Sequence, residues 1–103
     1  MYKLGVYIPD SHIEQVKSAM FAAGAGRIGQ YDNCCWQTAG TGQFRPLAGS
    51  NPHIGQHGAV ETVPETRVEL VVDDPLIRAV LAAMRSSHPY EEPAFDVVRL
   101  EQF

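Results

Sequence analysis

Hydrophobic and polar residues alternate at the start of the chain. In residues 2–8, YKLGVYI, every second position is apolar: Tyr2, Leu4, Val6 and Ile8. This period of two predicts a half-buried strand. The same type of pattern predicts a strand over residues 67–74, RVELVVDD, and a last strand over residues 94–103, AFDVVRLEQF.

Two other segments place their apolar residues at helical intervals. Residues 11–24 begin with Ser11 and Glu14 at capping-box spacing and end at Gly24, which predicts a helix with a glycine stop. Asp74 and Pro75 predict an N-cap and a first-turn proline for a second helix over residues 75–87. Its apolar stripe is wide enough to cover a sheet and consists of Leu76, Ile77, Val80, Leu81 and Met84.

Residues 28–38, IGQYDNCCWQT, predict a further strand. In that strand the adjacent Cys34 and Cys35 would point to opposite faces, so they could neither close an ordinary disulfide nor easily bind one metal ion. We therefore expect both thiols to be reduced and structural, which suits a cytoplasmic protein. The pattern leaves open which face of this strand is buried.

The element order strand, helix, strand, strand, helix, strand predicts the fold class. It is the order of an α+β, ferredoxin-like βαββαβ sandwich, in which two helices cover one face of an antiparallel sheet. With 103 residues the chain is long enough for one core and too short for two, so residues 1–103 are expected to form a single domain.

One segment exceeds the minimal pattern of this fold. Residues 40–65 contain five of the nine glycines and three of the seven prolines, which predicts a long glycine-rich excursion before the third main strand. Residues 42–46, GQFRP, can form a short extra strand within it. In a small fold an excursion of this length usually reaches a neighbouring subunit or a ligand.

Charge and hydropathy exclude several classes of partner. The net charge is −4 and no lysine and arginine cluster is present, so we expect no nucleic-acid partner. The sequence has neither a signal-peptide pattern nor 18 consecutive apolar residues, so we expect a soluble, cytoplasmic protein without a membrane partner.

No catalytic set can be assembled from the sequence. No serine lies in a nucleophile-elbow glycine pattern. Residues 24–29, GAGRIG, follow a helix, whereas a dinucleotide-binding loop follows a strand. The only lysines are Lys3 and Lys17, which excludes a P-loop. Of the functional hypotheses, an enzyme in its own right is therefore the least favoured.

Histidines and carboxylates are the remaining candidates for chemistry. In HPYEEP, residues 88–93, His88 with Glu91 or Glu92 offers a nitrogen and a carboxylate suited to a divalent cation. His53 and His57 lie four residues apart, although the glycines and proline around them prevent a shared helical face. The predicted metal ligands are thus His88, Glu91, His53 and His57.

Two alternatives to a metal site stay open. The first alternative is favoured because surface His and Glu side chains are usually simply exposed. In it, the prolines fix the loop, Tyr90 packs against the domain, and the glutamates are solvated. In the other, Arg27 and Arg45 bind a small anion, or pair with these glutamates across an interface between subunits.

Two sequence motifs resemble a known family. Residues 26–55, GRIGQYDNCCWQTAGTGQFRPLAGSNPHIG, and residues 88–97, HPYEEPAFDV, are similar to the small domain inserted in bacterial YqfO-type (Nif-three-like) proteins. The larger members of that family carry a dinuclear metal centre in flanking domains, for which 103 residues leave no room. The resemblance therefore implies no hydrolase activity for this chain.

The element order and the HPYE motif also resemble CutA, a trimeric ferredoxin-like protein linked to divalent-cation tolerance, and more loosely the trimeric PII signalling proteins. This resemblance implies a homo-oligomer, with a trimer favoured. Our leading hypothesis is a non-enzymatic, oligomeric domain that binds a small ligand or a divalent metal ion. The alternative is an accessory domain that docks on a separate metal-dependent hydrolase of the YqfO type.

Overall fold

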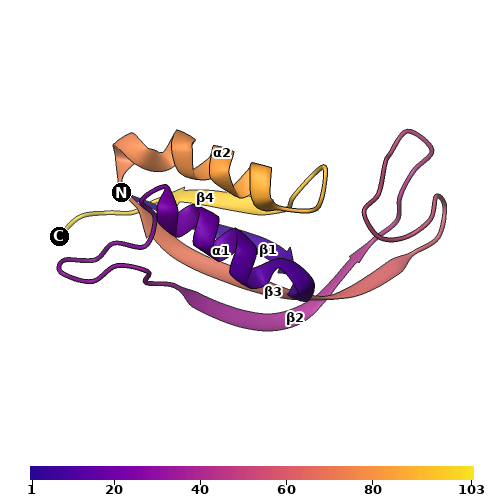
Figure 1. Cartoon of the computed structure of the whole chain (residues 1–103), viewed down its shortest axis with the longest axis horizontal. Coiled ribbons are helices and arrows are strands. Elements are labelled where there is room, and N and C mark those ends of the chain that lie inside the picture. The colour runs from indigo at the N-terminus through magenta and orange to yellow at the C-terminus, as the bar shows by residue number, and fades with distance from the viewer.

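The computed structural model describes residues 1–103 and contains one four-stranded antiparallel sheet. The strand order is β2-β3-β1-β4, and both α-helices cover one face of the sheet (Figure 1). The predicted α+β, ferredoxin-like βαββαβ fold is confirmed. In chain order the elements are β1 (Tyr2–Pro9), the 3₁₀ turn η1 (Asp10–His12), α1 (Ile13–Ala22), β2 (Trp36–Phe44), β3 (Glu61–Val72), the 3₁₀ turn η2 (Asp74–Leu76), α2 (Ile77–Ser87) and β4 (Phe95–Arg99).

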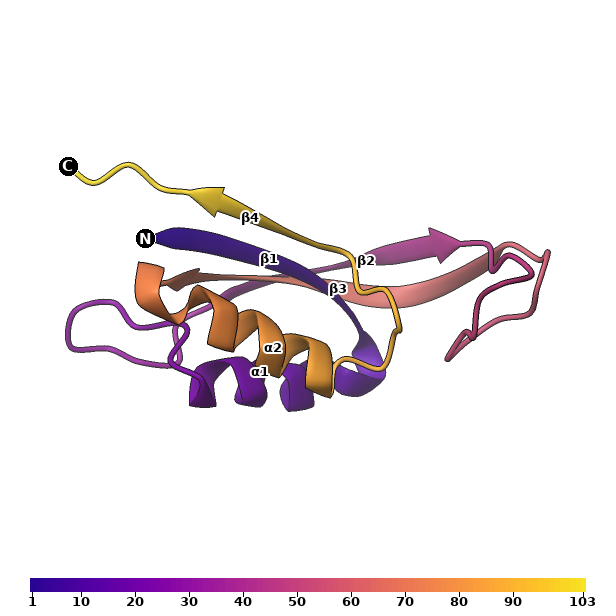
Figure 2. The same cartoon turned by 90° about the horizontal axis from the view of Figure 1, so that it is seen from above.

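The core lies between the sheet and the helix layer, which Figure 2 shows edge-on. The alternating positions of β1 and the stripe of α2 both face it, as predicted. Each fully buried aliphatic side chain contributes about 1.5–3 kcal/mol relative to exposure. The fully buried residues that these two elements contribute to the core cluster are Leu4, Val6, Ile8, Val80 and Met84. No helix is long and apolar enough to cross a membrane.

The predicted capping side chains are wrong, but the predicted first-turn proline is confirmed, because Pro75 lies in the first turn of η2. Both α-helices follow a 3₁₀ turn, and neither start has a side-chain capping bond. The Ser11 hydroxyl instead contacts His12 Nδ1 at 2.7 Å, and the Asp74 carboxylate accepts from the Met1 amino group and from Arg99. The capping side chains therefore have other partners. The predicted glycine stop is confirmed, because Gly24 has a φ of +105°.

The strand predicted over residues 28–38 is displaced. Residues 28–35 form a turn, and β2 begins only at Trp36. The turn is fixed by Gly26, whose N–H donates to the Val71 carbonyl (2.8 Å) and whose carbonyl accepts from Cys34 N–H (2.9 Å). Cys34 and Cys35 are consequently not on opposite faces of a strand; both are half-buried with free thiols.

The strands extend further into the glycine-rich segment than predicted. Strand β2 continues to Phe44, so it absorbs the expected short strand, and β3 begins at Glu61 rather than at residue 67. The two strands pair from Trp36↔Glu69 to Phe44↔Glu61 as a long hairpin that projects beyond the helices (Figure 1). The excursion proper is therefore residues 45–60. The last strand is also shorter than expected and ends at Arg99.

A charged network lies flat on the sheet face opposite the helices. The Arg67 guanidinium donates twice to Asp96 (2.9 and 3.0 Å) and once to Glu69 (2.9 Å), and it stacks on the Tyr7 ring. A Cβ atom at Gly5 would lie 2.2 Å from this guanidinium, so glycine makes room for it. Hydrogen bonding to Arg67 lowers the pKa of the Asp96 carboxyl.

The two ends of the chain meet at one end of the molecule (Figure 1). The Leu100 N–H donates to the Met1 carbonyl at 3.0 Å. Close by, Asp74 pairs with the Met1 amino group and with Arg99, which also bonds to the Tyr2 hydroxyl and covers the Tyr2 ring. The bond from the Met1 amino group lowers the pKa of the Asp74 carboxyl. The excursion lies at the opposite end.

Candidate functional site

The excursion and the loop after α2 form one site. The Asn51 N–H donates to Glu91 Oε1 at 2.8 Å, a contact between residues 40 positions apart in the sequence. This bond holds residues 45–60 against residues 88–94. The glycine-rich excursion and the HPYEEP loop, which are far apart in the sequence, thus lie side by side.

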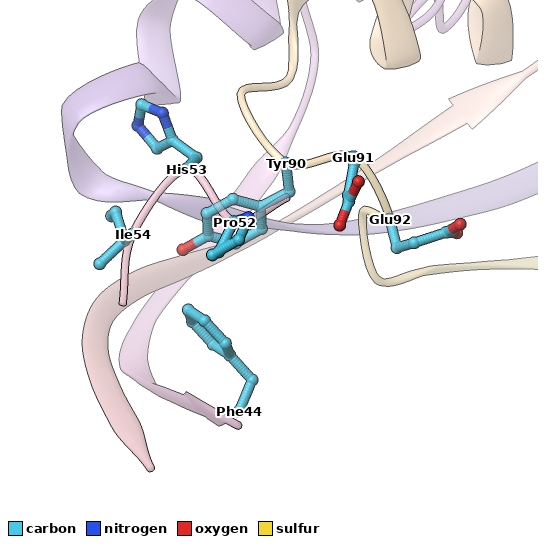
Figure 3. Close-up of a pocket in the computed structure, with 7 residues that line it drawn as sticks. All are labelled: Phe44, Pro52, His53, Ile54, Tyr90, Glu91 and Glu92. Carbon is cyan, nitrogen blue, oxygen red and sulfur yellow. The ribbon is translucent and has the colours of Figure 1, made fainter. Parts of the chain in front are cut away.

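Two adjoining cavities lie at this junction and together form what we call the Tyr90 groove. Both are lined by Phe44, Tyr90 and Glu92. The first cavity, of about 110 Å³, is shown in Figure 3 and is completed by Pro52, His53, Ile54 and Glu91. The second, of about 150 Å³, is completed by Tyr7, Gln43, Glu65 and Ala94.

Aromatic rings form the wall of the groove. The Tyr90 ring centroid lies 5.8 Å from that of Phe44 and 6.3 Å from that of His53, and Figure 3 shows Tyr90 between these two side chains. His53 also meets His12 edge-on at 5.6 Å, which connects the excursion to η1. Tyr90 is thus the packing centre of the site, as predicted from the size of its ring.

His88 fixes the loop from inside the protein. It is 6% exposed, its Nε2 donates to the Tyr7 carbonyl at 2.7 Å, and its Nδ1 accepts from the Tyr90 N–H at 3.1 Å. This arrangement requires the neutral ring with the proton on Nε2. Burial lowers the pKa of His88, while the Tyr7 carbonyl and the Glu65 charge oppose that shift. Both ring nitrogens are therefore already used.

The four predicted metal ligands do not converge. His53 and Glu91 line the first cavity, but Glu91 already accepts from Asn51. His88 is held by backbone groups, and His57 Nε2 contacts the Ser50 carbonyl at 2.8 Å outside the groove. No three His, Cys, Asp or Glu side chains are grouped so that they could hold a metal ion. A metal ion at this site stays a prediction, and it would require further ligands from another molecule.

Sequence reasoning missed Phe44, Glu65 and Tyr7 as site residues. They come from β2, β3 and β1, so only the strand pairing brings them to Tyr90. One local signal exists at Gly42. A Cβ atom there would lie 2.1 Å from Glu65 Oε1, so the glycine leaves space for the Glu65 carboxylate to lie across β2.

The groove is acidic and its polar groups are incompletely paired. Glu65, Glu91 and Glu92 form no ion pair, although Glu69, Asp74 and Asp96 elsewhere in the chain do. The Tyr90 hydroxyl is buried without a hydrogen-bond partner. Burial, together with the neighbouring Glu65 carboxylate, raises the pKa of this hydroxyl.

Solved structures place the fold in a class. CutA from Archaeoglobus fulgidus, described as a periplasmic divalent cation tolerance protein, superposes with a TM-score of 0.69 over 100% of this chain and 87% of its own. The two sequences are 13% identical, so this likeness establishes the fold alone. In architecture the chain is thus a ferredoxin-like domain similar to CutA and PII-like proteins.

Relatives that also share sequence identity define the resemblance more closely than the fold does. A Bacillus cereus protein related to NIF3 is 40% identical with a TM-score of 0.83, over 98% of this chain and 26% of that one. A Mycobacterium leprae protein named GTP cyclohydrolase 1 type 2 homolog is 50% identical over 92% of this chain and 25% of its own length. The predicted resemblance to NIF3-related, YqfO-type proteins is confirmed. The chain spans about a quarter of the length of these relatives, and it matches no family model.

Proposed function

We propose that this chain is a non-enzymatic, cytoplasmic binding or regulatory domain that works as a cyclic homo-oligomer, with the Tyr90 groove as its ligand site. The bond from Asn51 to Glu91 supports this most directly, because it unites the excursion and the loop after α2 around one concave, aromatic surface. Concave, mainly apolar surfaces with a few polar groups are typical of ligand sites.

The exposed sheet edges support self-association. Strands β2 and β4 are the outer strands, so each leaves one row of backbone hydrogen-bonding groups without a partner in the sheet. Trp36 at the start of β2 is 70% exposed. Closed cyclic assembly is the usual way to cover such surfaces in small homo-oligomers, and the likeness to CutA favours a trimer.

Multi-angle light scattering at micromolar concentration tests the oligomer. We expect a mass of more than one subunit, about three for the favoured trimer. A protein that stays monomeric as its concentration is raised to the millimolar range would contradict the proposal. Trp36→Ser is a useful companion variant, because loss of this exposed ring should weaken association if β2 lies in the interface.

Zinc calorimetry tests the predicted metal ligands. A site that uses His53 and Glu91 requires weaker binding in the His53→Ala and Glu91→Ala variants. His57→Ala is the comparison within the excursion, since His57 lies outside the groove. Identical weak binding in all of these proteins would mean that the groove is not a metal site.

A second function is favoured by the meeting of the chain ends. The bond between Leu100 and Met1 places the start of the chain beside the end of β4, which suits a compact accessory domain that docks on a separate metal-dependent hydrolase of the YqfO type. Co-purification of the chain as a monomer with such a protein would support this accessory role over the independent oligomer.

A further inference from the structure

We propose that the Tyr90 groove binds an organic cation, a guanidinium or alkylammonium group, against the adjoining Phe44 and Tyr90 rings and the Glu65 carboxylate. This inference rests on the proposed function of the groove as a ligand site and names the chemical class of its ligand. Three independent features of the groove point to that class: its charge, its rings and the Tyr90 hydroxyl.

The negative charge of the groove favours a positively charged ligand. Among all the residues that line its two cavities there are three glutamates and no lysine or arginine. None of the three carboxylates is neutralised by a cation of this chain. Arg67 is near, since it stacks on Tyr7, but its guanidinium is already bonded to Glu69 and Asp96. Carboxylate acceptors form the stronger, charge-assisted hydrogen bonds with such donors.

The rings provide the second half of a cation site. This chain already uses the same contact three times, with arginines lying 4.6–5.0 Å from the ring centroids of Tyr2, Tyr7 and Phe95. Phe44 and Tyr90 have carboxylates beside them but no such cation. A cation within about 6 Å of a ring face is attracted by its quadrupole.

The Tyr90 hydroxyl supplies a directed contact. Buried hydroxyls almost always have a hydrogen-bond partner, and this one has none. The phenolic oxygen can accept an N–H from the ligand, and the neighbouring Glu65 carboxylate can accept a second one. An oxygen that gains a donor only on binding favours a donor ligand over an apolar one.

The cavity volumes and the small number of metal-ligating side chains also favour an organic cation over a metal ion. The cavities, of about 110 and 150 Å³, are smaller than the roughly 300–1,000 Å³ of sites for drug-sized molecules, so they fit the charged end of a ligand. A further cavity of about 400 Å³, which shares Tyr7 and Glu65 with the second one and is also lined by Arg67, offers space for the rest of the ligand. A bare calcium ion takes about six to eight oxygen ligands, whereas this chain groups fewer than three candidate side chains. An organic cation needs only one carboxylate and the ring faces.

The cation can come from two sources that share this chemistry. One is a free small molecule with a guanidinium or ammonium group. The other is an arginine side chain of a second copy of this chain, where Arg27, Arg45 and Arg78 form no ion pair within the subunit. The experiment below separates the two.

Nuclear magnetic resonance titration of the whole chain with ethylguanidinium tests the site. We expect saturable amide shifts centred on residues 51–54, 65 and 90–92, and none with the neutral analogue N-ethylurea. Glu65→Gln, which keeps the shape, and Phe44→Leu, which removes the ring, should each weaken binding about fivefold. Glu101→Gln, an exposed carboxylate outside the groove, is the matched control and should bind like the wild type.

Several outcomes would overturn the inference: no saturable shift, equal binding of N-ethylurea, or equal losses in Glu65→Gln and Glu101→Gln. These failures differ from failure of the proposed function, because an oligomer that binds zinc but not ethylguanidinium would keep that function and lose only the ligand class. Where ethylguanidinium binds, light scattering then identifies the source of the cation. Dissociation of the oligomer indicates a subunit arginine, and an unchanged mass indicates a free cation.

Discussion

The two ends of this molecule satisfy their polar groups in opposite ways. At the end where the chain termini meet, Asp74 pairs with the Met1 amino group and Arg99, and Arg99 is also placed over the Tyr2 ring. At the excursion end, Glu65 and the Tyr90 hydroxyl have no such partners. At the first end, the carboxylate and the aromatic ring both have a cation from the same subunit. The other end presents the same kinds of group, a carboxylate and an aromatic ring, without a cation.

This difference distinguishes groups that stabilise the fold from groups that are available for binding. Groups that pair internally stabilise the domain, whereas groups left unpaired at a concave surface are available to a ligand or a second subunit. The turn of residues 26–35 is bonded to β3 through the Gly26 N–H and the Val71 carbonyl, and the excursion is bonded to the loop after α2 through the Asn51 N–H and Glu91.

A pair of glycines gives the largest expected contrast between the ends. Gly26 and Gly58 both have a φ of +80°, but a Cβ atom at Gly26 would lie 2.7 Å from the Cys34 carbonyl oxygen, whereas Gly58 has nothing within 4 Å. Gly26→Ala combines backbone strain with a steric clash and should lower the free energy of unfolding by about 3 kcal/mol or more. Gly58→Ala should cost about 1 kcal/mol. Urea unfolding measures both, and equal losses would contradict the contrast.

His88 offers the next largest effect, at the excursion end. His88→Ala removes a buried ring and leaves the Tyr7 carbonyl and the Tyr90 N–H without their partners. We expect a loss of about 2–3 kcal/mol in the free energy of unfolding. His57→Ala, at an exposed position, should change it by less than about 0.5 kcal/mol. A near-neutral His88→Ala would mean that the loop does not depend on this ring.

The pH dependence of stability should follow from His88 as well. Its pKa is lowered in the folded protein, mainly by burial, so the unfolded chain binds the proton first as the pH falls. Stability is therefore fully present above the ordinary pKa of about 6.5 and decreases as the pH falls below it. The facing groups are Glu65, which opposes this shift, and His12 and His53, which add to it.

Urea titrations between pH 7.5 and pH 5 measure this effect, which we expect to be smaller than that of His88→Ala. His88→Asn, which keeps a polar side chain but cannot titrate, should flatten the pH profile, whereas His57→Ala should leave it unchanged. A profile that is identical in His88→Asn and the wild type would assign the dependence to other groups.

The parts of the fold predicted from sequence are those with one buried face. The alternation in β1 and the stripe of α2 are imposed by a single core, so local periodicity reveals them. Strand β2 is an outer strand with mostly exposed residues, and its position is set by pairing with β3 rather than by its own pattern. The alternation in residues 28–35 was misleading, because Gly29 and Asn33 adopt positive φ angles there.

The sequence indicates the turn at the HPYEEP loop, but not the contacts that form the groove around it. Pro89 of HPYEEP indicates a turn, and the loop does turn there, with His88 in an extended conformation. That His88 points inward depends on the Tyr7 carbonyl, 81 positions away in the sequence. Glu65 and Phe44 reach Tyr90 only through strand pairing. Such long-range contacts leave no periodic signal in the sequence.

The bond between the Leu100 N–H and the Met1 carbonyl has a consequence for chain entropy. A host protein that carried this domain within one of its loops would need to bring together two attachment points that are already neighbours. The entropic cost of closing a loop grows only slowly with its length, and a folded domain with adjacent ends behaves as a short one. Folding of this domain would then close the host loop, so that its own stability helps to order the protein around it.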